Sequence, residues 1–116
     1  MDDMALLREY AMRNSEQAFA TLVSRHIDLV YSAALPQVGN HHQAQEITQA
    51  VFVILARKAR SLSSKTVLPG WLFQAARLTA ANYLRGEIRR VRREQEAYMR
   101  SNLSENSSDR SSSRGR

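Results

Sequence analysis

Two adjacent histidines, His41 and His42, precede Glu46 by one helical turn in the stretch HHQAQEITQAVF. Imidazole and carboxylate groups bind transition metals, and residues four apart share one face of a helix. A zinc site needs three or four ligands, and the chain has only one further histidine, His26, and no cysteine. We therefore expect no metal site and no cofactor.

Serine and histidine also occur together in hydrolases, where a base activates a nucleophile. The chain has no nucleophile elbow of the G-x-S-x-G kind and no glycine-rich loop that could bind phosphate. We expect no catalytic residues, and the chain is not expected to be an enzyme.

The chain is 116 residues long, which allows one domain with a modest core. The lack of cysteine excludes disulfides and is compatible with a reducing compartment. No apolar stretch approaches the length that crosses a bilayer, and the first residues do not resemble a secretory signal. We expect a cytoplasmic protein that is not inserted into a membrane.

Charge is distributed unevenly along the chain, whose net charge is +6. Residues 1–56 carry three basic and six acidic side chains, whereas residues 57–116 carry 14 basic and five acidic ones. A basic half indicates binding to a polyanion such as nucleic acid, and an acidic half indicates a different partner. The alternative is a solvated surface with a charged tail.

Four segments have helical periodicity, and none alternates as a strand does. We predict an all-α protein, a compact bundle of about four helices over residues 1–99. The helices are expected over residues 3–13, from about 15 to the region of Pro36, 43–59 and 71–99. Residues 100–116 are rich in serine and arginine and are predicted to form a flexible tail or a truncated linker.

The second predicted helix begins after Asn14 or Ser15, either of which can be its N-cap. His26 lies within its apolar stripe, where a histidine is more often a core residue with a hydrogen-bonded ring nitrogen than a metal ligand. Pro36 is expected to kink this helix or to stop it one turn early. The stripe comprises Phe19, Leu22, Val23, His26, Ile27, Val30 and Ala34.

The third predicted helix has two distinct faces, and His41 and His42 are expected in the loop before it. Its core side comprises Ala44, Ile47, Val51, Ile54 and Leu55. Gln45, Gln49, Phe52 and Ala56 share the opposite side, flanked by Glu46 and Thr48. An apolar strip with a polar rim is typical of a helix that docks on another protein. The alternative is that Phe52 extends the core.

The fourth predicted helix combines an apolar side with a basic one. Its core side comprises Leu72, Phe73, Ala76, Ala80, Tyr83 and Leu84. Five of the nine residues from Arg85 to Arg93 are arginines, more than capping of a helix end requires. Hydroxyl groups and a cation in the preceding loop, together with Trp71, could hold an unstacked base and its phosphate. The alternative is that Trp71 anchors the core.

Three segments, AFATLVSRHIDLVYSAAL, GNHHQAQEITQAVFVILARKA and GWLFQAARLTAANYLR, occur in this order. Together they resemble region 2 of bacterial RNA polymerase sigma factors, in the extracytoplasmic-function (ECF) group, over about residues 5–95. The resemblance implies an all-helical domain that docks on core RNA polymerase and recognises and melts the −10 element of the promoter. An anti-sigma factor is a further partner that the resemblance suggests.

The resemblance also implies which residues bind the polymerase and which bind DNA. The EITQAVF motif would dock on the coiled coil of the largest (beta-prime) polymerase subunit, with contacts from Glu46, Gln49, Phe52 and Ala56. The loop from about Ser61 to Pro69 would hold a flipped-out base. The residues expected to bind DNA are Ser63, Ser64, Lys65, Trp71, Gln74, Arg77, Asn82, Arg85 and Arg89.

The chain departs from the family pattern at Glu46, where aspartate is usual, and at Ala50, where a carboxylate is usual. Pro36 occupies a position that is normally helical, and no second helix-turn-helix domain follows in the given sequence. Two alternative functions are therefore a generic basic DNA-binding module and a truncated sigma remnant without initiation activity.

Overall fold

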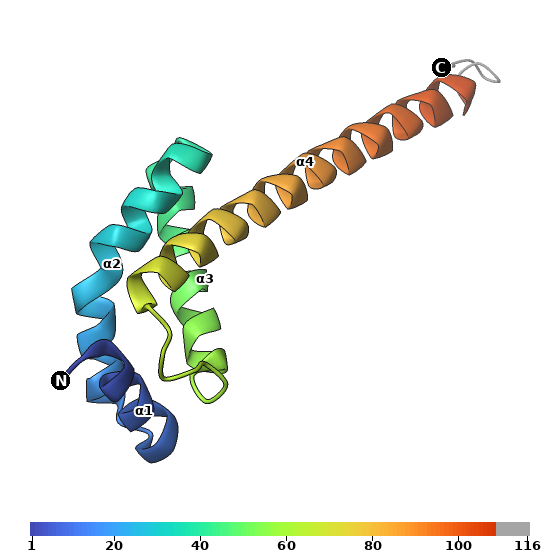
Figure 1. Cartoon of the computed structure of the whole chain (residues 1–116). Coiled ribbons are helices and arrows are strands. Elements are labelled where there is room, and N and C mark those ends of the chain that lie inside the picture. Colours follow the sequence, from blue (N-terminus) through green and yellow to red (C-terminus); the bar gives the residue numbers. More distant parts are fainter. Residues whose placement is uncertain (109–116) are drawn as a thin grey trace. The chain divides into compact units, whose positions relative to one another are not determined.

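The computed structural model describes residues 1–108, with side chains as far as Arg100. This part of the chain consists of helices and contains no strand, which confirms the predicted all-α class (Figure 1). The four helices are α1 (Asp3–Arg13), α2 (Glu16–Val38), α3 (His41–Lys58) and α4 (Leu68–Ser108). The chain divides into two units, Met1–Tyr83 and Leu84–Arg116, and α4 contributes to both.

Short polar side chains begin the first two helices. Asp2 caps α1 by accepting a hydrogen bond from the backbone N–H of Ala5 at 2.8 Å. Ser15 caps α2 in the same way, with the N–H of Ala18 at 3.1 Å. Between the helices, Asn14 adopts the left-handed conformation, which asparagine tolerates better than most residues. Ser15 is one of the two N-caps that the sequence predicted.

Pro36 lies inside α2, which continues to Val38, so the early stop that was one of its two expected effects does not occur. Because Pro36 lies in the last turn of the helix, its missing N–H removes only one hydrogen bond of a long ladder. Gly39 then ends the helix in the left-handed conformation (φ 68°), and its N–H bonds the carbonyl oxygen of Leu35 at 2.7 Å.

α3 begins earlier than predicted because Asn40 caps it. The Asn40 side chain accepts a hydrogen bond from the N–H of Gln43 at 3.0 Å. His41 and His42 therefore lie in the first turn of α3, and the prediction that they lie in the preceding loop is wrong.

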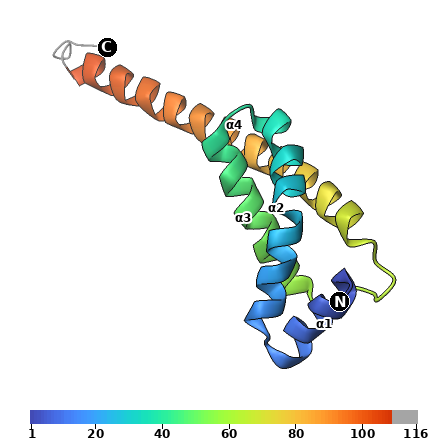
Figure 2. The same cartoon turned by 90° about the vertical axis from the view of Figure 1, so that its left-hand side faces the viewer.

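The core of the first unit is one cluster of apolar side chains to which all four helices contribute. α2 packs against both α1 and α3, and Figure 2 shows α2 and α3 side by side. The largest side chains that are almost fully buried are Leu7, Leu22, Val30, Ile47, Val51, Leu55, Leu68 and Leu72. Within α2, α3 and α4 these residues are four or eight positions apart, which places them on one face of each helix.

An ionic contact fastens α1 to α2. The Asp3 carboxylate lies 3.1 Å from Arg25 Nη1 and 2.9 Å from His26 Nε2. The prediction that a ring nitrogen of His26 is hydrogen-bonded is confirmed, but His26 is half-buried and does not belong to the core cluster. Partial burial raises the pKa of Asp3, but hydrogen bonds and electrostatic attraction from His26 and Arg25 outweigh it and lower that pKa below 3.8.

α4 begins at Leu68, three residues before the expected start, and its part in the first unit runs to Tyr83. Its most buried residues after Leu68 recur every four positions: Leu72, Ala76 and Ala80. Phe73 was expected on this core side but is 40% exposed, so that prediction is wrong. A stripe with a strict four-residue period is narrow, and its neighbours one position along the chain face away from it.

α4 continues in the second unit to Ser108, beyond the expected end at Met99. Residues 100–108 of the predicted tail are thus described as helix, and residues 109–116 lie outside the described residues. None of the helices over residues 1–108 has the length and apolar character needed to cross a bilayer.

Candidate functional site

The outward side of α3 exposes a stripe of three polar side chains and one apolar side chain. Gln45, Glu46, Gln49 and Val53 are all exposed. Gln45, Gln49 and Val53 follow at intervals of four residues and Glu46 lies three residues before Gln49, so all four lie along one side of the helix. We call these four residues the α3 stripe. Val53, for which no role was predicted, is 49% exposed. An exposed valine among amides is compatible with a protein-docking surface, which combines apolar and polar side chains.

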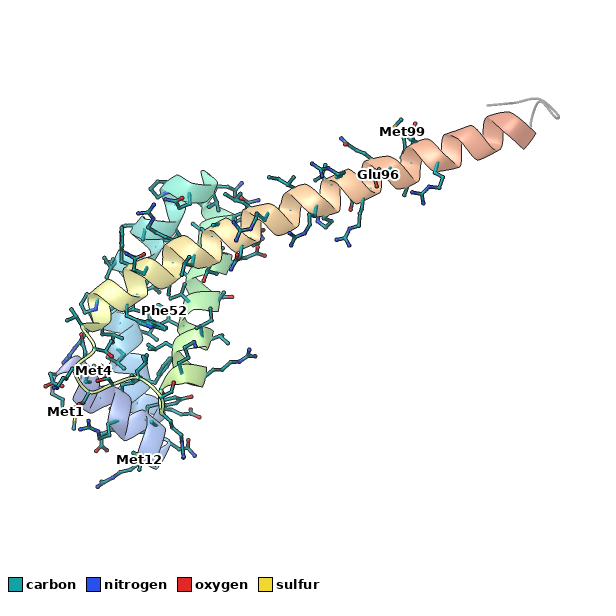
Figure 3. The ribbon with its side chains drawn as sticks, turned by 45° about the vertical axis from the view of Figure 1, so that its right-hand side comes forward. Met1, Met4, Met12, Phe52, Glu96 and Met99 are labelled. Carbon is teal, nitrogen blue, oxygen red and sulfur yellow. The ribbon has the colours of Figure 1, made fainter. Side chains whose placement is uncertain are left out.

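Phe52, expected at the centre of this exposed side, is instead part of the core. It is 7% exposed and points from α3 into the bundle (Figure 3). The expectation that Phe52 faces solvent is therefore wrong, and the alternative that it extends the core is confirmed. Ala56 is half-buried at the edge of the same side. The apolar member of the exposed stripe is the next residue, Val53.

Glu46 is held by two neighbours. Its carboxylate accepts a hydrogen bond of 2.8 Å from the hydroxyl of Tyr83 on α4. His42 Nε2 lies 3.4 Å from the other carboxylate oxygen, so the helical pair seen in the sequence is in contact. The link between Glu46 and Tyr83 joins residues 37 positions apart, which no local spacing could have predicted.

A groove between α2 and α3 borders the α3 stripe. Ile27, Asp28 and Tyr31 line it from α2, and Gln45, Thr48 and Gln49 line it from α3. Ile27 was expected in the core stripe of α2, but it is exposed on this groove, so that prediction is wrong. The groove enlarges the surface on which a partner of α3 could rest.

The loop between α3 and α4 exposes the three polar residues expected to bind nucleic acid, Ser63, Ser64 and Lys65. The Ser63 hydroxyl oxygen accepts a hydrogen bond from the N–H of Lys65 at 3.0 Å, and the Ser63 carbonyl accepts one from Thr66. These bonds form a tight turn that holds the side chains of Ser64 and Lys65 at the surface.

A hollow of about 200 Å³ separates this loop from α1. Apolar side chains form its walls, and three polar ones, Arg8, Arg60 and Ser64, lie among them. Met4 and Met12 of α1, labelled in Figure 3, belong to the apolar walls. A hollow with flexible thioethers and nearby guanidinium groups could accept a flat aromatic ring with a phosphate beside it.

The outward side of α4 in the first unit carries five exposed side chains, which we call the α4 outer face: Phe73, Gln74, Arg77, Leu78 and Asn82. Gln74, Arg77 and Asn82 are exposed as the DNA-binding prediction requires. The Arg77 guanidinium lies over the Phe73 ring, 5.9 Å from its centroid. Trp71 is half-buried and packs against the core, which favours the anchor interpretation. Phe73 is the exposed aromatic ring that the sequence interpretation missed.

Arg85 and Arg89, the remaining residues expected to bind DNA, are exposed on the part of α4 that belongs to the second unit. Arg90, between two acidic residues, is paired with them: its guanidinium lies 2.6 Å from Glu87 and 2.9 Å from Glu94. Arg89 takes no part in that ion-pair network. Among residues 1–108 there is no group of three or more histidine, aspartate or glutamate side chains that could hold a metal ion.

Comparison with known protein families identifies the domain. The family model for sigma-70 region 2 matches residues 22–94, more than half of the chain. The chain belongs to the sigma-70 region 2 family. Sigma-70 region 2 domains act in transcription initiation, where they bind RNA polymerase and promoter DNA. No curated protein and no solved structure matches the chain.

The sigma-70 region 2 match spans most of α2, all of α3 and α4 as far as Glu94. It therefore includes the α3 stripe, the loop and the α4 outer face. It begins at Leu22, after α1, which lies outside the matched residues.

Proposed function

We propose that this sigma-70 region 2 domain belongs to the ECF group, docks on the beta-prime coiled coil of core RNA polymerase through α3, and recognises and melts the −10 element. The ECF assignment is supported by the three sequence segments in order and by the EITQAVF motif in α3. An anti-sigma factor that covers the α3 stripe is a further proposed partner.

The observation that carries the docking proposal is the α3 stripe. Glu46, Gln49 and Val53 follow one another along the exposed side of a helix whose other side is firmly buried. A partner helix can therefore contact the stripe without disturbing the core. Val53 supplies the apolar contact that was first expected from Phe52. Ala56 lies half-buried beside the stripe.

The melting proposal rests on the loop and the α4 outer face. Separated strands expose base faces, and aromatic rings, amides and guanidinium groups bind them by stacking and hydrogen bonds. Phe73 and Arg77 form one such stacking platform, with Gln74 beside it. The hollow between the loop and α1 supplies a second position for a flipped-out base, because its apolar walls lie next to Arg60 and Ser64.

Retention of the chain on immobilised core RNA polymerase tests the docking surface. We expect the natural chain to be retained and retention to fall about tenfold for Val53→Asp and severalfold for Gln49→Ala, since each removes or repels a contact at the centre of a small interface. Gln17→Ala is the control, because Gln17 is exposed on α2 and does not line the groove beside the α3 stripe.

Equal retention of Val53→Asp and Gln17→Ala would contradict docking through the α3 stripe. If the natural chain itself were not retained, the truncated remnant without initiation activity would be the better description. A forked promoter duplex with a fluorescent base at −10, mixed with the reconstituted complex, then tests melting. A signal that is unchanged by Phe73→Ala would contradict the role of the α4 outer face.

A further inference from the structure

The second unit carries large apolar side chains on an otherwise charged helix. Ile88, Val91, Tyr98 and Met99 are 58%, 43%, 68% and 61% exposed. Single exposed apolar residues are ordinary, but four in twelve positions among arginines and glutamates form a stripe that a partner would cover. The proposed contacts of region 2 with polymerase and promoter make no use of them.

The spacing of the stripe is that of a coiled-coil seam. Leu84, Ile88, Val91, Gln95 and Tyr98 are separated alternately by four and three residues. This is the d-a-d-a-d order of a heptad repeat, in which a and d residues face a second helix. Met99 follows at the neighbouring e position. We call Ile88, Val91, Gln95 and Tyr98 the seam.

Charged residues flank the seam with opposite signs on its two sides. Glu87 and Glu94 occupy the g positions, and Arg85 and Arg92 occupy e positions. In a parallel pair of helices, each g residue faces the e residue five positions later on the other helix. Glu87 would therefore face Arg92 of a second copy, and the pair would occur twice by symmetry.

The opposite orientation would be repulsive. In an antiparallel pair, g residues face g residues and e residues face e residues. Glu87 would then approach Glu94 of the other helix, and the arginines at the e positions would face each other. Like charges held together across an interface oppose association. The charges thus favour a parallel arrangement of two identical helices.

Two surface hollows lie along the same side of the helix, and their linings match the holes of knobs-into-holes packing. The first is lined by Glu87, Ile88, Val91, Arg92 and Gln95, and the second by Val91, Glu94, Gln95, Tyr98 and Met99. In a parallel pair, a d knob enters a hole of a, d, e and a residues, and an a knob enters a hole of d, g, a and d residues. Val91 of a second copy would enter the first hollow, and its Gln95 would enter the second.

We propose that the seam is a self-association surface through which two copies of this chain form a short parallel coiled coil. The partner is a second copy of this chain, because in the parallel register the seam, the flanking charges and the hollows of one copy fit those of the other. The inference does not rest on the proposed docking or melting role, since none of the four seam residues takes part in either.

The existing ion pairs of Arg90 do not prevent this association. Arg90 bridges Glu87 and Glu94 within one helix. Exposed pairs of this kind contribute little to stability, and the Glu87 carboxylate has a second oxygen for Arg92 of the other copy. The intrahelical pairs also help to keep a short seam helical before it associates.

Sedimentation velocity of the full chain from about 1 μM to about 1 mM tests the proposal over the range of weak protein association. We expect a concentration-dependent monomer–dimer equilibrium that is lost in Ile88→Asp, which places a charge in the seam. Glu87→Arg should raise the dissociation constant about tenfold, because both symmetric pairs become repulsive. Glu96→Arg is the matched control, because it changes the net charge equally at an outward b position, and its dissociation constant should stay unchanged.

The orientation has its own measurement. Glu87→Arg and Arg92→Glu chains, each weakened alone, should form a mixed dimer with an affinity like that of the natural chain, because both flanking pairs are again opposite in sign. A monomer at every concentration would overturn the proposal, and so would equal effects of Glu87→Arg and Glu96→Arg. Tighter association of Glu87→Arg would indicate antiparallel helices and would overturn it too.

Discussion

The hydroxyl of Tyr83 on α4 donates a hydrogen bond of 2.8 Å to the carboxylate of Glu46 on α3. This bond joins the helix that carries the α4 outer face to the helix that carries the α3 stripe. ECF domains usually have aspartate at the position of Glu46, according to the resemblance noted in the sequence. The additional methylene of glutamate extends the carboxylate toward Tyr83.

We predict that Tyr83→Phe and Glu46→Asp each lower the free energy of unfolding by about 1 kcal/mol, the usual net contribution of a hydrogen bond. The first removes the donor, and the second shortens the acceptor. Urea denaturation of both single variants and of the double variant measures the coupling. If the two losses simply added, the bond between these side chains would contribute nothing.

Phe52 and Val53 are adjacent in the chain, but their substitution should change the free energy of unfolding by very different amounts. Phe52→Ala removes a buried ring and should lower the free energy of unfolding by about 3 kcal/mol or more. Val53→Asp changes an exposed position and should alter it by less than about 1 kcal/mol. Thermal and urea denaturation measure both. Comparable losses for the two variants would contradict the placement of Val53 on the α3 stripe.

The contact of Asp3 with Arg25 and His26 should make stability depend on pH. The pKa of Asp3 is lowered in the folded chain, so its contribution is present above 3.8 and is lost as the pH falls through the folded-state pKa. Asp3→Asn should therefore lower the melting temperature near neutral pH, and the difference from the natural chain should vanish in acid. Melting curves recorded across this pH range measure it. Asp2→Asn, which retains an N-capping residue, is the control, and a difference that persisted in acid would contradict the assignment.

Phe73→Ala should weaken binding of single-stranded −10 DNA by about 1–3 kcal/mol, the range measured for loss of base stacking on an aromatic ring. Because Phe73 is exposed, the folded domain should lose little stability. Arg77→Ala removes a positive charge beside the same ring and should lower the salt dependence of binding. Fluorescence anisotropy at several salt concentrations measures both effects. Arg13→Ala, on α1, is the control for the loss of one charge, and an equal change in its salt dependence would count against a contact at Arg77.

The helical class was predictable because apolar periodicity and capping residues are local signals. Ser15 follows the N-cap rule, and Leu22 and Val30 follow the period of a buried helix face. The early start of α3 was missed because no capping role was predicted for Asn40, whose side chain caps this helix.

Whether a side chain at the edge of a buried face is itself buried or exposed was less predictable, because it depends on how the helices pack. Phe52 and Val53 lie 100° apart around α3, and either could have been the apolar residue left exposed. Phe73 was predicted on the core side of α4, yet that side is too narrow to include it. Contacts such as that of Tyr83 with Glu46 need the fold itself.

α3 presents its buried and exposed sides within the same 18 residues, which makes partner binding and folding thermodynamically linked. The α3 stripe exists only while Ile47, Val51 and Leu55 are packed on the other side. A partner that binds only the folded chain stabilises it by about 2.7 kcal/mol when present at 100 times its dissociation constant. Copies bound through α3 should therefore outlast free copies during proteolysis, and the supply of the partner would set the lifetime of the protein.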